Sequence, residues 1–313
     1  MRIAVLDDYQ HAAHRFADWD GLGADVRFHA EHIADPTALA AALAGCDVVV
    51  AMRERTPFTA EVLDLLPDLR LLVTTGRANA SIDLDAARAR GVVVCGTDSP
   101  SSATPELTWA LILAVARHVP QEDARLRAGG WQHTIGTDLA GRTLGVVGLG
   151  RIGARVARIG AAFGMDVVAW SANLDPAAAA EAGVRAVPKE ELFATSDVVT
   201  VHYKLSARSV GIVGRDDLAL MRPTAFLVNT SRGPLVDTGA LLEALHAGRI
   251  GGAGLDVYDV EPLPAGHPLR SAPRTVLTPH LGYVTEDTYA TFFAQAVEDI
   301  AAWAAGSPVR VLG

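Results

Sequence analysis

The sequence predicts an α/β protein with two doubly wound parallel sheets, and two observations support this prediction. Short apolar runs alternate with amphipathic stretches along the chain, which is the pattern of parallel strands connected by helices. The pattern begins a second time near residue 143, after a helical segment at 104–118. The length of 313 residues agrees with two domains, because one domain usually has roughly 150 residues.

The first hundred residues contain five apolar runs that predict buried strands. Between them, the segments 37–43 and 59–65 have helical patterns, and each follows a dipeptide that ends in proline. A longer helix at 104–118 starts at Pro105 and is ended by Pro120, because proline fits the first turn of a helix but not its interior. The predicted strands lie at 3–6, 26–28, 48–51, 71–74 and 92–94.

The second half of the chain repeats this plan and then returns to the first domain. A helix at 285–304 follows the last strand, and we expect it to cross back and pack on the first domain. We therefore predict one domain of residues 1–98 and 285–313, and a second domain of residues 99–284. After the apolar run at 143–147, the predicted strands lie at 167–170, 198–202, 225–229, 252–257 and 275–277.

A glycine motif, Gly148-Leu-Gly150-Arg-Ile-Gly153, follows the strand that opens the second domain. Gly148 permits a tight turn, Gly150 lets the backbone approach a pyrophosphate, and Gly153 lets the following helix pack on the strand. The N-terminus of that helix offers N–H groups and the positive end of its dipole to phosphates. Such glycines also occur in plain turns, but the strand before them and the helix after them favour a Rossmann dinucleotide-binding domain with a nicotinamide cofactor.

The position that selects between NAD and NADP departs from the usual pattern. The next strand ends at Ser171-Ala-Asn173, where an acidic residue would normally bind the ribose 2′-hydroxyl and repel a 2′-phosphate. Ser171 and Asn173 do not repel a phosphate, but no arginine follows directly to pair with one. Lys204, two residues after His202, either supplies a positive charge or is a solvated loop lysine. The sequence leaves the choice between NAD and NADP open.

Three ionisable residues, Arg232, Glu261 and His280, follow three successive strands of the second domain, and parallel sheets bind ligands at the carboxyl ends of strands. Arg232 is a permanent, forked cation suited to a substrate carboxylate. A carboxylate such as Glu261 favours the imidazolium form of a neighbouring histidine, and His280 would then protonate a carbonyl oxygen as hydride reaches the carbon. Taken singly, each is more often a surface ion-pair partner, a loop acid or a structural histidine, but their joint position indicates a site.

Composition and charge exclude several classes of function. The net charge of −9 and the absence of a Lys/Arg-rich run argue against a nucleic-acid partner. The apolar N-terminal stretch is too short for a signal peptide, and no apolar helical stretch reaches the length of about 18 residues that spans a membrane. Cys46 and Cys95 lie beside apolar runs, so we expect buried, reduced thiols in a cytoplasmic protein. We predict no metal site, because compact acidic or cysteine ligands do not accompany the paired histidines, which are His11, His14, His29 and His32.

Four motifs in this order resemble the D-isomer-specific 2-hydroxyacid dehydrogenase family over nearly the whole chain. The resemblance implies a flavodoxin-like substrate domain, formed by residues 1 to about 98 and the last helix, beside the Rossmann domain. It implies that Arg232, Glu261 and His280 are the catalytic triad, with His280 as the acid/base. The motifs are Gly148-Leu-Gly-Arg-Ile-Gly153, Val228-Asn-Thr-Ser-Arg-Gly-Pro-Leu-Val-Asp237, Gly254-Leu-Asp-Val-Tyr-Asp-Val-Glu-Pro262 and Thr278-Pro-His-Leu-Gly282.

The resemblance also assigns residues to two binding sites. Asp256 would help to hold the nicotinamide carboxamide, and Thr104 would lie near the cofactor. The predicted cofactor-binding residues are Gly148, Gly150, Arg151, Ile152, Gly153, Ser171, Asn173, His202, Lys204, Thr104, Thr230 and Asp256. The predicted substrate-binding residues are Arg53, Arg77, Ala78 and Asn79, the last three in a loop whose backbone N–H groups hold the substrate carboxylate.

Several positions depart from the family pattern. Ala78 stands where a second glycine is common, Ser171 replaces a frequent aspartate and Lys204 a frequent proline, so both the substrate and the cofactor stay open. Relatives that oxidise formate carry glutamine in place of Glu261, and formate oxidation is therefore disfavoured.

We expect an NAD- or NADP-dependent oxidoreductase that interconverts a small 2-keto acid and a D-2-hydroxy acid. The alternative is a cofactor-sensing binding protein on the same scaffold, but no peptide-binding extension like that of the family's corepressors is recognisable. The helix at 104–118 carries a broad apolar surface, and the resemblance implies that it forms part of a homodimer interface. Burial of this helix between the two domains would be the simpler explanation.

Overall fold

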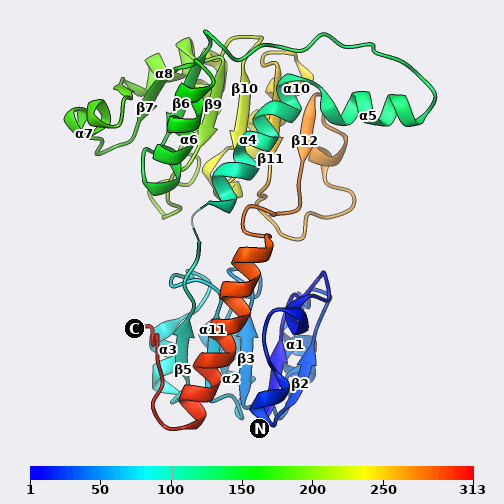
Figure 1. The fold of residues 1–313 in the computed structure, drawn as a ribbon, viewed down its shortest axis with the longest axis vertical. Helices are drawn as coiled ribbons and strands as arrows, with labels where there is room; N and C mark the ends of the chain where they lie inside the picture. Colours follow the sequence, from blue (N-terminus) through cyan, green and yellow to red (C-terminus); the bar gives the residue numbers. More distant parts are fainter. Residues whose placement is uncertain (101) are drawn as a thin grey trace. The chain divides into compact units, whose positions relative to one another are not determined.

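The computed structural model describes residues 1–100 and 102–313 and divides into two compact units (Figure 1). The first, which we call the split unit, comprises Met1–Pro100 and Val284–Gly313. The second, the central unit, comprises Ser101–Tyr283. The boundaries that the sequence predicts, after residues 98 and 284, fall within two residues of these.

The split unit contains a five-stranded parallel sheet in the order β2-β1-β3-β4-β5. Each strand lies within two residues of its predicted position, because a strand buried on both faces appears in the sequence as an uninterrupted apolar run. The strands are β1 (Arg2–Val5), β2 (Asp25–Phe28), β3 (Val48–Ala51), β4 (Leu71–Thr74) and β5 (Val93–Gly96).

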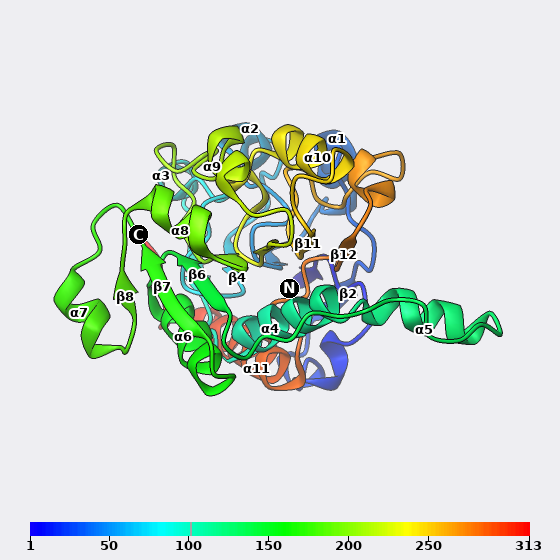
Figure 2. The same cartoon turned by 90° about the horizontal axis from the view of Figure 1, so that it is seen from above.

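Helices cover both faces of this sheet. The helices α1 (Pro36–Ala42), α2 (Ala60–Asp64) and α3 (Leu84–Ala89) each begin after a residue whose side chain accepts an N–H bond from the first turn. They pack on one face, and α11 (Glu286–Ala304) packs against β4 on the other (Figure 2). The last helix thus belongs to the same unit as the first hundred residues.

The central unit contains a seven-stranded parallel sheet in the order β12-β11-β10-β9-β6-β7-β8. Two parallel sheets with helices confirm the predicted α/β fold class. The two-residue strand β8 (Arg185–Ala186) is too short to form an apolar run, and the sequence did not predict it. The other strands are β6 (Thr143–Val147), β7 (Asp166–Trp170), β9 (Val198–Val201), β10 (Phe226–Asn229), β11 (Gly252–Leu255) and β12 (Thr275–Leu277).

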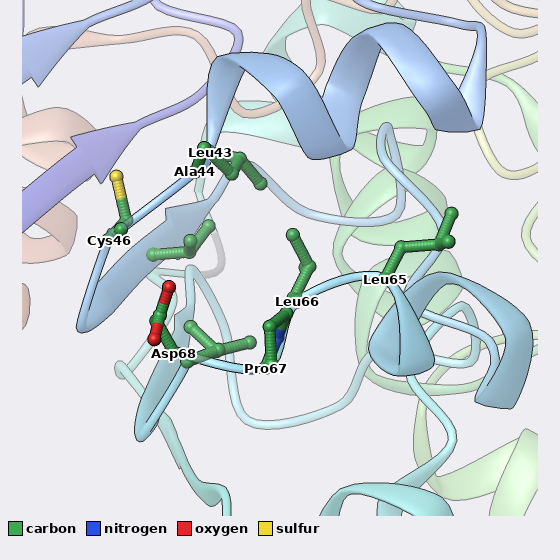
Figure 3. A pocket seen from close by; sticks show the side chains of 10 residues that line it. Leu43, Ala44, Cys46, Leu65, Leu66, Pro67 and Asp68 are labelled. Carbon is green, nitrogen blue, oxygen red and sulfur yellow. The ribbon is translucent and has the colours of Figure 1, made fainter.

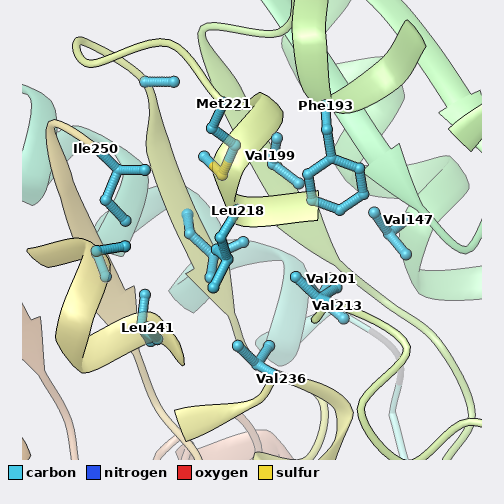
Figure 4. Close-up of a cluster of buried hydrophobic side chains, with 14 of the residues drawn as sticks. Val147, Phe193, Val199, Val201, Val213, Leu218, Met221, Val236, Leu241 and Ile250 are labelled. Carbon is cyan, nitrogen blue, oxygen red and sulfur yellow. The ribbon is translucent and has the colours of Figure 1, made fainter. Parts of the chain in front are cut away.

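Two hydrophobic layers enclose the central sheet, and alternate residues of one strand enter different layers. Val146 of β6 faces the layer under α4 (Ala103–Ala116) and α6 (Arg151–Ala162), while Val147 faces the opposite layer. Figure 4 shows that opposite layer, in which Phe193 and Leu218 meet strand side chains such as Val199. Full burial of one such side chain is worth about 1.5–3 kcal/mol. The helices on this face are α8 (Lys189–Thr195), α9 (Arg215–Leu220) and α10 (Thr238–His246), while α7 (Pro176–Glu181) precedes β8.

The predicted helix at 104–118 is α4, which ends two residues earlier at Ala116, and a second helix that the sequence did not predict follows it. His118 has a φ of +52°, which ends α4, and Pro120 lies in the first turn of α5 (Val119–Arg127). The apolar surface predicted for this helix is already covered within the central unit. Four of its five apolar side chains are buried against the sheet and α6, namely Trp109, Leu111, Ile112 and Val115.

Exposed apolar side chains are found instead on an arm, which we define as α5 and the loop at 128–138. In Figures 1 and 2 the arm stands out from the sheet of the central unit. Trp131 is 72% exposed and Ile135 is 93% exposed. The Glu122 carboxylate accepts N–H bonds from His133 and Thr134, so the loop is folded back on α5.

Candidate active site

The glycine loop after β6 has the space and the backbone directions that a dinucleotide requires. Gly148 has a φ of +97°, and a Cβ there would lie 2.6 Å from the His202 carbonyl oxygen. A Cβ on Gly153 would lie 2.1 Å from the Gly148 carbonyl oxygen, so α6 reaches the strand only because this residue is glycine. A Cβ on Gly150 would meet no atom within 4 Å, and α6 starts at the next residue. Open space before a helix N-terminus fits a pyrophosphate.

The other two predicted residues of this loop open α6. The side chain of Arg151, the first helical residue, is exposed, while Ile152 packs partly on the hydrophobic layer under α4.

Hydroxyl groups line the end of β7, where the cofactor ribose is expected. The Ser171 hydroxyl accepts an N–H bond of 3.2 Å from Leu149 in the glycine loop. The Tyr203 hydroxyl accepts an N–H bond of 3.3 Å from Ala172. The Tyr203 ring stacks on Trp170 with a centroid distance of 6.1 Å and an interplanar angle of 18°. Tyr203 was not predicted from the sequence. The predicted Asn173 and Lys204 are both exposed.

His202, at the end of β9, is held in the interior by Thr200. Its Nε2 lies 2.9 Å from the Thr200 hydroxyl, and its Nδ1 is buried with no hydrogen-bond partner in the described part of the chain. Burial lowers the pKa of His202 to about 3. The ring is therefore neutral near neutral pH, and the part of this residue closest to the glycine loop is its carbonyl group.

His280, in the loop after β12, forms a short ion-pair contact with Glu261. The distance between His280 Nδ1 and Glu261 Oε2 is 2.5 Å, and the two side chains are 13% and 20% exposed. The other Glu261 oxygen accepts the Tyr258 N–H at 3.0 Å, which fixes the carboxylate. The edge of Tyr283 meets the His280 ring, with 5.5 Å between centroids. The sequence predicted this histidine–glutamate pair.

Asp256 fixes the loop that carries His280. One of its oxygens accepts the Thr278 hydroxyl at 2.6 Å and the Leu281 N–H at 2.7 Å, and the other accepts the Gly282 N–H at 2.9 Å. His280 has a φ of +55° in this loop, which L-residues seldom adopt. Burial raises the pKa of Asp256, an effect that the hydrogen bonds from Thr278 and Leu281 oppose. The predicted partner of Asp256 was the nicotinamide carboxamide, but its partners in the described chain are groups of this loop.

Threonines connect the start of α4 to the same strand ends. The Thr104 hydroxyl donates to the Gly282 carbonyl at 2.9 Å, which attaches the helix to the His280 loop. The Thr108 hydroxyl lies 2.8 Å from that of Thr230, which follows β10. Thr104 and Thr230, both predicted to bind the cofactor, therefore support the loops that surround the site.

Arg232 is placed by the turn that follows β10. The Asn229 amide donates to the Arg232 carbonyl at 2.9 Å, and its oxygen accepts the Ser231 N–H at 3.0 Å. A Cβ on Gly233 would lie 2.1 Å from the Tyr258 carbonyl carbon, so this turn lies directly against the segment that leads to Glu261. The central unit thus brings a fixed cation and a carboxylate–imidazole pair to neighbouring strand ends.

Comparison with known proteins identifies the family. A family model described as D-isomer specific 2-hydroxyacid dehydrogenase, NAD binding domain, matches residues 109–282. The chain belongs to this family. It is accordingly an NAD(P)-dependent oxidoreductase of 2-hydroxy acids, as the resemblance of its motifs predicted.

The relatives of this dehydrogenase are named after different substrates. It is 39% identical over 256 residues to the glyoxylate reductase of Aeropyrum pernix, and the aligned region covers 79% of this chain and 76% of the relative. It is 36% identical over 264 residues to the D-3-phosphoglycerate dehydrogenase of Archaeoglobus fulgidus, covering 83% of this chain. The chain spans 50% of the length of that second relative. A solved phosphoglycerate oxidoreductase from Vibrio cholerae has a TM-score of 0.94 and 39% identity, with 98% of this chain and 100% of that chain covered.

In the split unit, the dehydrogenase places its four predicted substrate-binding residues after β3 and β4. The Asn79 amide donates to the Arg53 carbonyl at 2.6 Å and to the Thr74 hydroxyl at 2.9 Å, so Asn79 joins the two strand ends. Arg53 has a φ of +52° and donates to the Thr75 carbonyl at 3.0 Å. Ala78 is exposed.

Arg77, the fourth of these residues, forms an ion pair of 2.7 Å with Asp98, and its side chain is 62% exposed. To bind substrate, the Arg77 guanidinium would therefore have to leave Asp98 or contact the substrate through a nitrogen other than Nε.

The two cysteines are buried and form no disulfide, as predicted. Cys46 borders a cavity of about 20 Å³ between Leu43 and Leu66 (Figure 3), which has room for a water molecule and no larger ligand. Burial raises the pKa of Cys46, and burial together with Asp299 raises that of Cys95 to about 12, so neither thiol is a nucleophile.

In residues 1–100 and 102–313, no cluster of three or more His, Cys, Asp or Glu side chains is arranged to hold a metal ion. No helix there combines the length and the apolar character needed to cross a membrane.

Proposed function

We propose that this dehydrogenase reversibly reduces a small 2-keto acid to the D-2-hydroxy acid, with His280 as the acid/base. The observation that supports this most directly is the contact of 2.5 Å between His280 and Glu261, on a loop that Asp256 fixes with three hydrogen bonds. A general acid must be held in the correct tautomer and orientation, and these contacts do both. Nδ1 faces the Glu261 carboxylate, and we assign the proton transfer with the substrate to Nε2.

In the reductive direction, a bound nicotinamide would supply a hydride to the keto carbon. As negative charge develops on the carbonyl oxygen, that oxygen takes the proton of His280 Nε2. Glu261 stabilises the imidazolium before this transfer. In the oxidative direction, neutral His280 accepts the hydroxyl proton. No metal is needed to polarise the carbonyl group, since the imidazolium and Arg232 supply positive charge.

Arg232 would bind the substrate carboxylate and turn the keto group toward His280. Its guanidinium is charged at all relevant pH values and its forked donors match a carboxylate. The Asn229 amide and the close contact of Gly233 with Tyr258 hold the turn that carries it. Backbone N–H groups of the loop at 75–79 in the split unit are the further donors that we assign to substrate binding, with Arg53, Arg77, Ala78 and Asn79 shaping that loop.

The cofactor would bind at the carboxyl ends of the central strands, with its pyrophosphate at the start of α6. The space at Gly150 supports this assignment, as does the convergence of β6, β7 and β9 there. The residues that we assign to it are Gly148, Gly150, Arg151, Ile152, Gly153, Ser171, Asn173, His202, Lys204, Thr104, Thr230 and Asp256.

We also propose a cytoplasmic homodimer. Two buried thiols without a disulfide agree with a reducing compartment. The ordered arm with its exposed Trp131 and Ile135 supports an interface with a second copy, and cyclic pairs are the commonest oligomers. Light scattering at micromolar concentration should give twice the chain mass. A monomer, or a dimer that survives Trp131→Glu together with Ile135→Glu, would contradict the arm interface.

A panel of small 2-keto acids, with oxidation of NADH and NADPH followed at 340 nm, tests the main proposal. Glyoxylate, pyruvate, hydroxypyruvate and its 3-phosphate span the chemistry suggested by the relatives' names. Turnover of at least one of them is expected. Tight cofactor binding with no turnover of any 2-keto acid would instead indicate a binding protein.

A further inference from the structure

The ribose end of the candidate cofactor site has hydroxyl groups where a carboxylate would select NAD. Ser171 and Tyr203 come from the ends of β7 and β9, which lie on either side of β6 in the sheet. Each hydroxyl accepts a backbone N–H, Ser171 from Leu149 and Tyr203 from Ala172. Tyr203 thus contacts the residue that follows Ser171, and both hydroxyls lie near the end of β7.

These contacts decide what the two hydroxyls can offer to a ligand. A hydroxyl has one hydrogen to donate, and neither hydrogen is used in accepting a backbone N–H. Each of the two hydroxyls therefore keeps a hydrogen that it can donate to a ligand. A 2′-phosphate presents three acceptor oxygens with negative charge, whereas a 2′-hydroxyl presents one neutral oxygen that must also donate. The pair of donors fits the phosphate better.

The charges around this edge favour the same ligand. No acidic residue occurs from Trp170 to Leu174, and the next one, Asp175, accepts the Ala177 N–H at 2.9 Å as the cap of α7. Lys204 follows Tyr203 directly and is exposed.

The Tyr203 ring is also held in place before any ligand binds. It stacks on Trp170, over whose ring the Lys189 ammonium lies at 5.4 Å. Lys189 is itself fixed by a contact of 2.8 Å with Asp217. A donor that is already oriented loses little entropy when the ligand arrives.

We propose that Tyr203, together with Ser171, makes this dehydrogenase select NADPH over NADH by donating hydroxyl hydrogen bonds to the 2′-phosphate. This inference rests on the proposed cofactor site. Tyr203 is then a residue that determines cofactor specificity, although it follows β9 and not β7, where the selecting residue normally lies.

Titration calorimetry on the full chain tests the proposal without turnover. NADPH should bind about 10-fold more tightly than NADH, which is roughly the effect of one hydrogen bond to a charged group. The fragments 2′,5′-ADP and 5′-AMP, which differ by the 2′-phosphate, should show the same preference. Equal affinities, or tighter NADH, would overturn the proposal. Failure of both dinucleotides to bind would instead remove the cofactor site on which it rests.

Three variants and one control assign the effect to residues. Tyr203→Phe keeps the ring stack and should weaken NADPH about 3- to 10-fold while changing NADH less than 2-fold. Ser171→Ala should act in the same direction, and Ser171→Asp should reverse the preference, since a carboxylate repels the phosphate. Tyr289→Phe removes a comparable hydroxyl bond, to Gln10 in the split unit, and should change neither affinity. Equal losses for both dinucleotides in Tyr203→Phe, at unchanged melting temperature, would show that Tyr203 has only a structural role.

Discussion

Two histidines at the carboxyl edge of one sheet have opposite properties because their partners differ. His280, after β12, has a carboxylate 2.5 Å from Nδ1 and is 13% exposed. His202, at the end of β9, has a threonine hydroxyl on Nε2 and a buried Nδ1 with no partner among the described residues. The first faces a carboxylate, while burial lowers the pKa of the second and keeps it neutral near neutral pH. Strand-end position is thus insufficient to indicate a catalytic role, and the hydrogen-bond partner decides it.

The largest effect is expected at His280. His280→Ala removes the proton donor and should lower kcat by about 10²–10⁴-fold, because that is the usual contribution of a general acid. Cofactor affinity should change little, which fluorescence titration can measure. His246→Ala is a matched control, since this exposed histidine on α10 is bonded only to the Leu242 carbonyl among the contacts found. Turnover within threefold of wild type in His280→Ala would remove this residue from the role.

A smaller but still large effect is expected from Asp256→Asn. The amide keeps the size of the side chain but has one acceptor oxygen, so at least one of the buried donors Thr278, Leu281 and Gly282 loses its partner. Each lost partner should cost about 1–3 kcal/mol of unfolding free energy. Because a displacement of about 1 Å can cost 10²-fold in rate, kcat should fall by roughly 10- to 100-fold. A variant with normal kcat would indicate that the His280 loop does not depend on this carboxylate.

Glu261→Gln should change the pH dependence more than the maximal rate. Reduction requires the imidazolium form of His280, and the carboxylate favours that form electrostatically. Without it, the loss of reductive activity with rising pH should begin at a lower pH. Gln can still accept the Tyr258 N–H, so the loop should keep its melting temperature. The measurement is kcat against pH for both proteins, and superimposable profiles would contradict the assigned role of Glu261.

The comparison also separates what the sequence could and could not predict. Both faces of each sheet are covered, so the strands are apolar and could be recognised in the sequence as apolar runs. Arg232, Glu261 and His280 could be recognised as ionisable residues that follow three of these strands. Tyr203 could not be found in this way. Its hydroxyl meets Ala172, 31 residues away, only because β7 and β9 lie on either side of β6. The helix α5 was also missed, since Pro120 is compatible with ending one helix and with starting the next.

The role of Asp256 illustrates the same limit. The sequence indicated a polar residue at a strand end, and the resemblance implied a contact with the nicotinamide. The three donors that it binds belong to a loop more than twenty residues later, which only the pairing of β11 with β12 brings near. Local patterns predict elements and candidate side chains, whereas the partners of those side chains depend on the order of strands in the sheet.

The last effect is expected at His202, and it should appear in stability. Its pKa is lowered to about 3 in the folded protein and is near 6.5 when the chain is unfolded. The folded state therefore binds fewer protons, so the stability contributed by neutral His202 is present above pH 6.5 and is lost as the pH falls below it. At pH 5 this loss is about 2 kcal/mol.

The variant His202→Gln tests this expectation, because glutamine cannot titrate but can still bond to Thr200. Urea unfolding should show that the wild type loses about 2 kcal/mol of unfolding free energy relative to the variant between pH 7.5 and pH 5. All other groups titrate alike in the two chains, so their contributions cancel. A difference that stays constant with pH would mean that His202 is protonated as easily in the fold as in the unfolded chain, and the contrast with His280 would then fail.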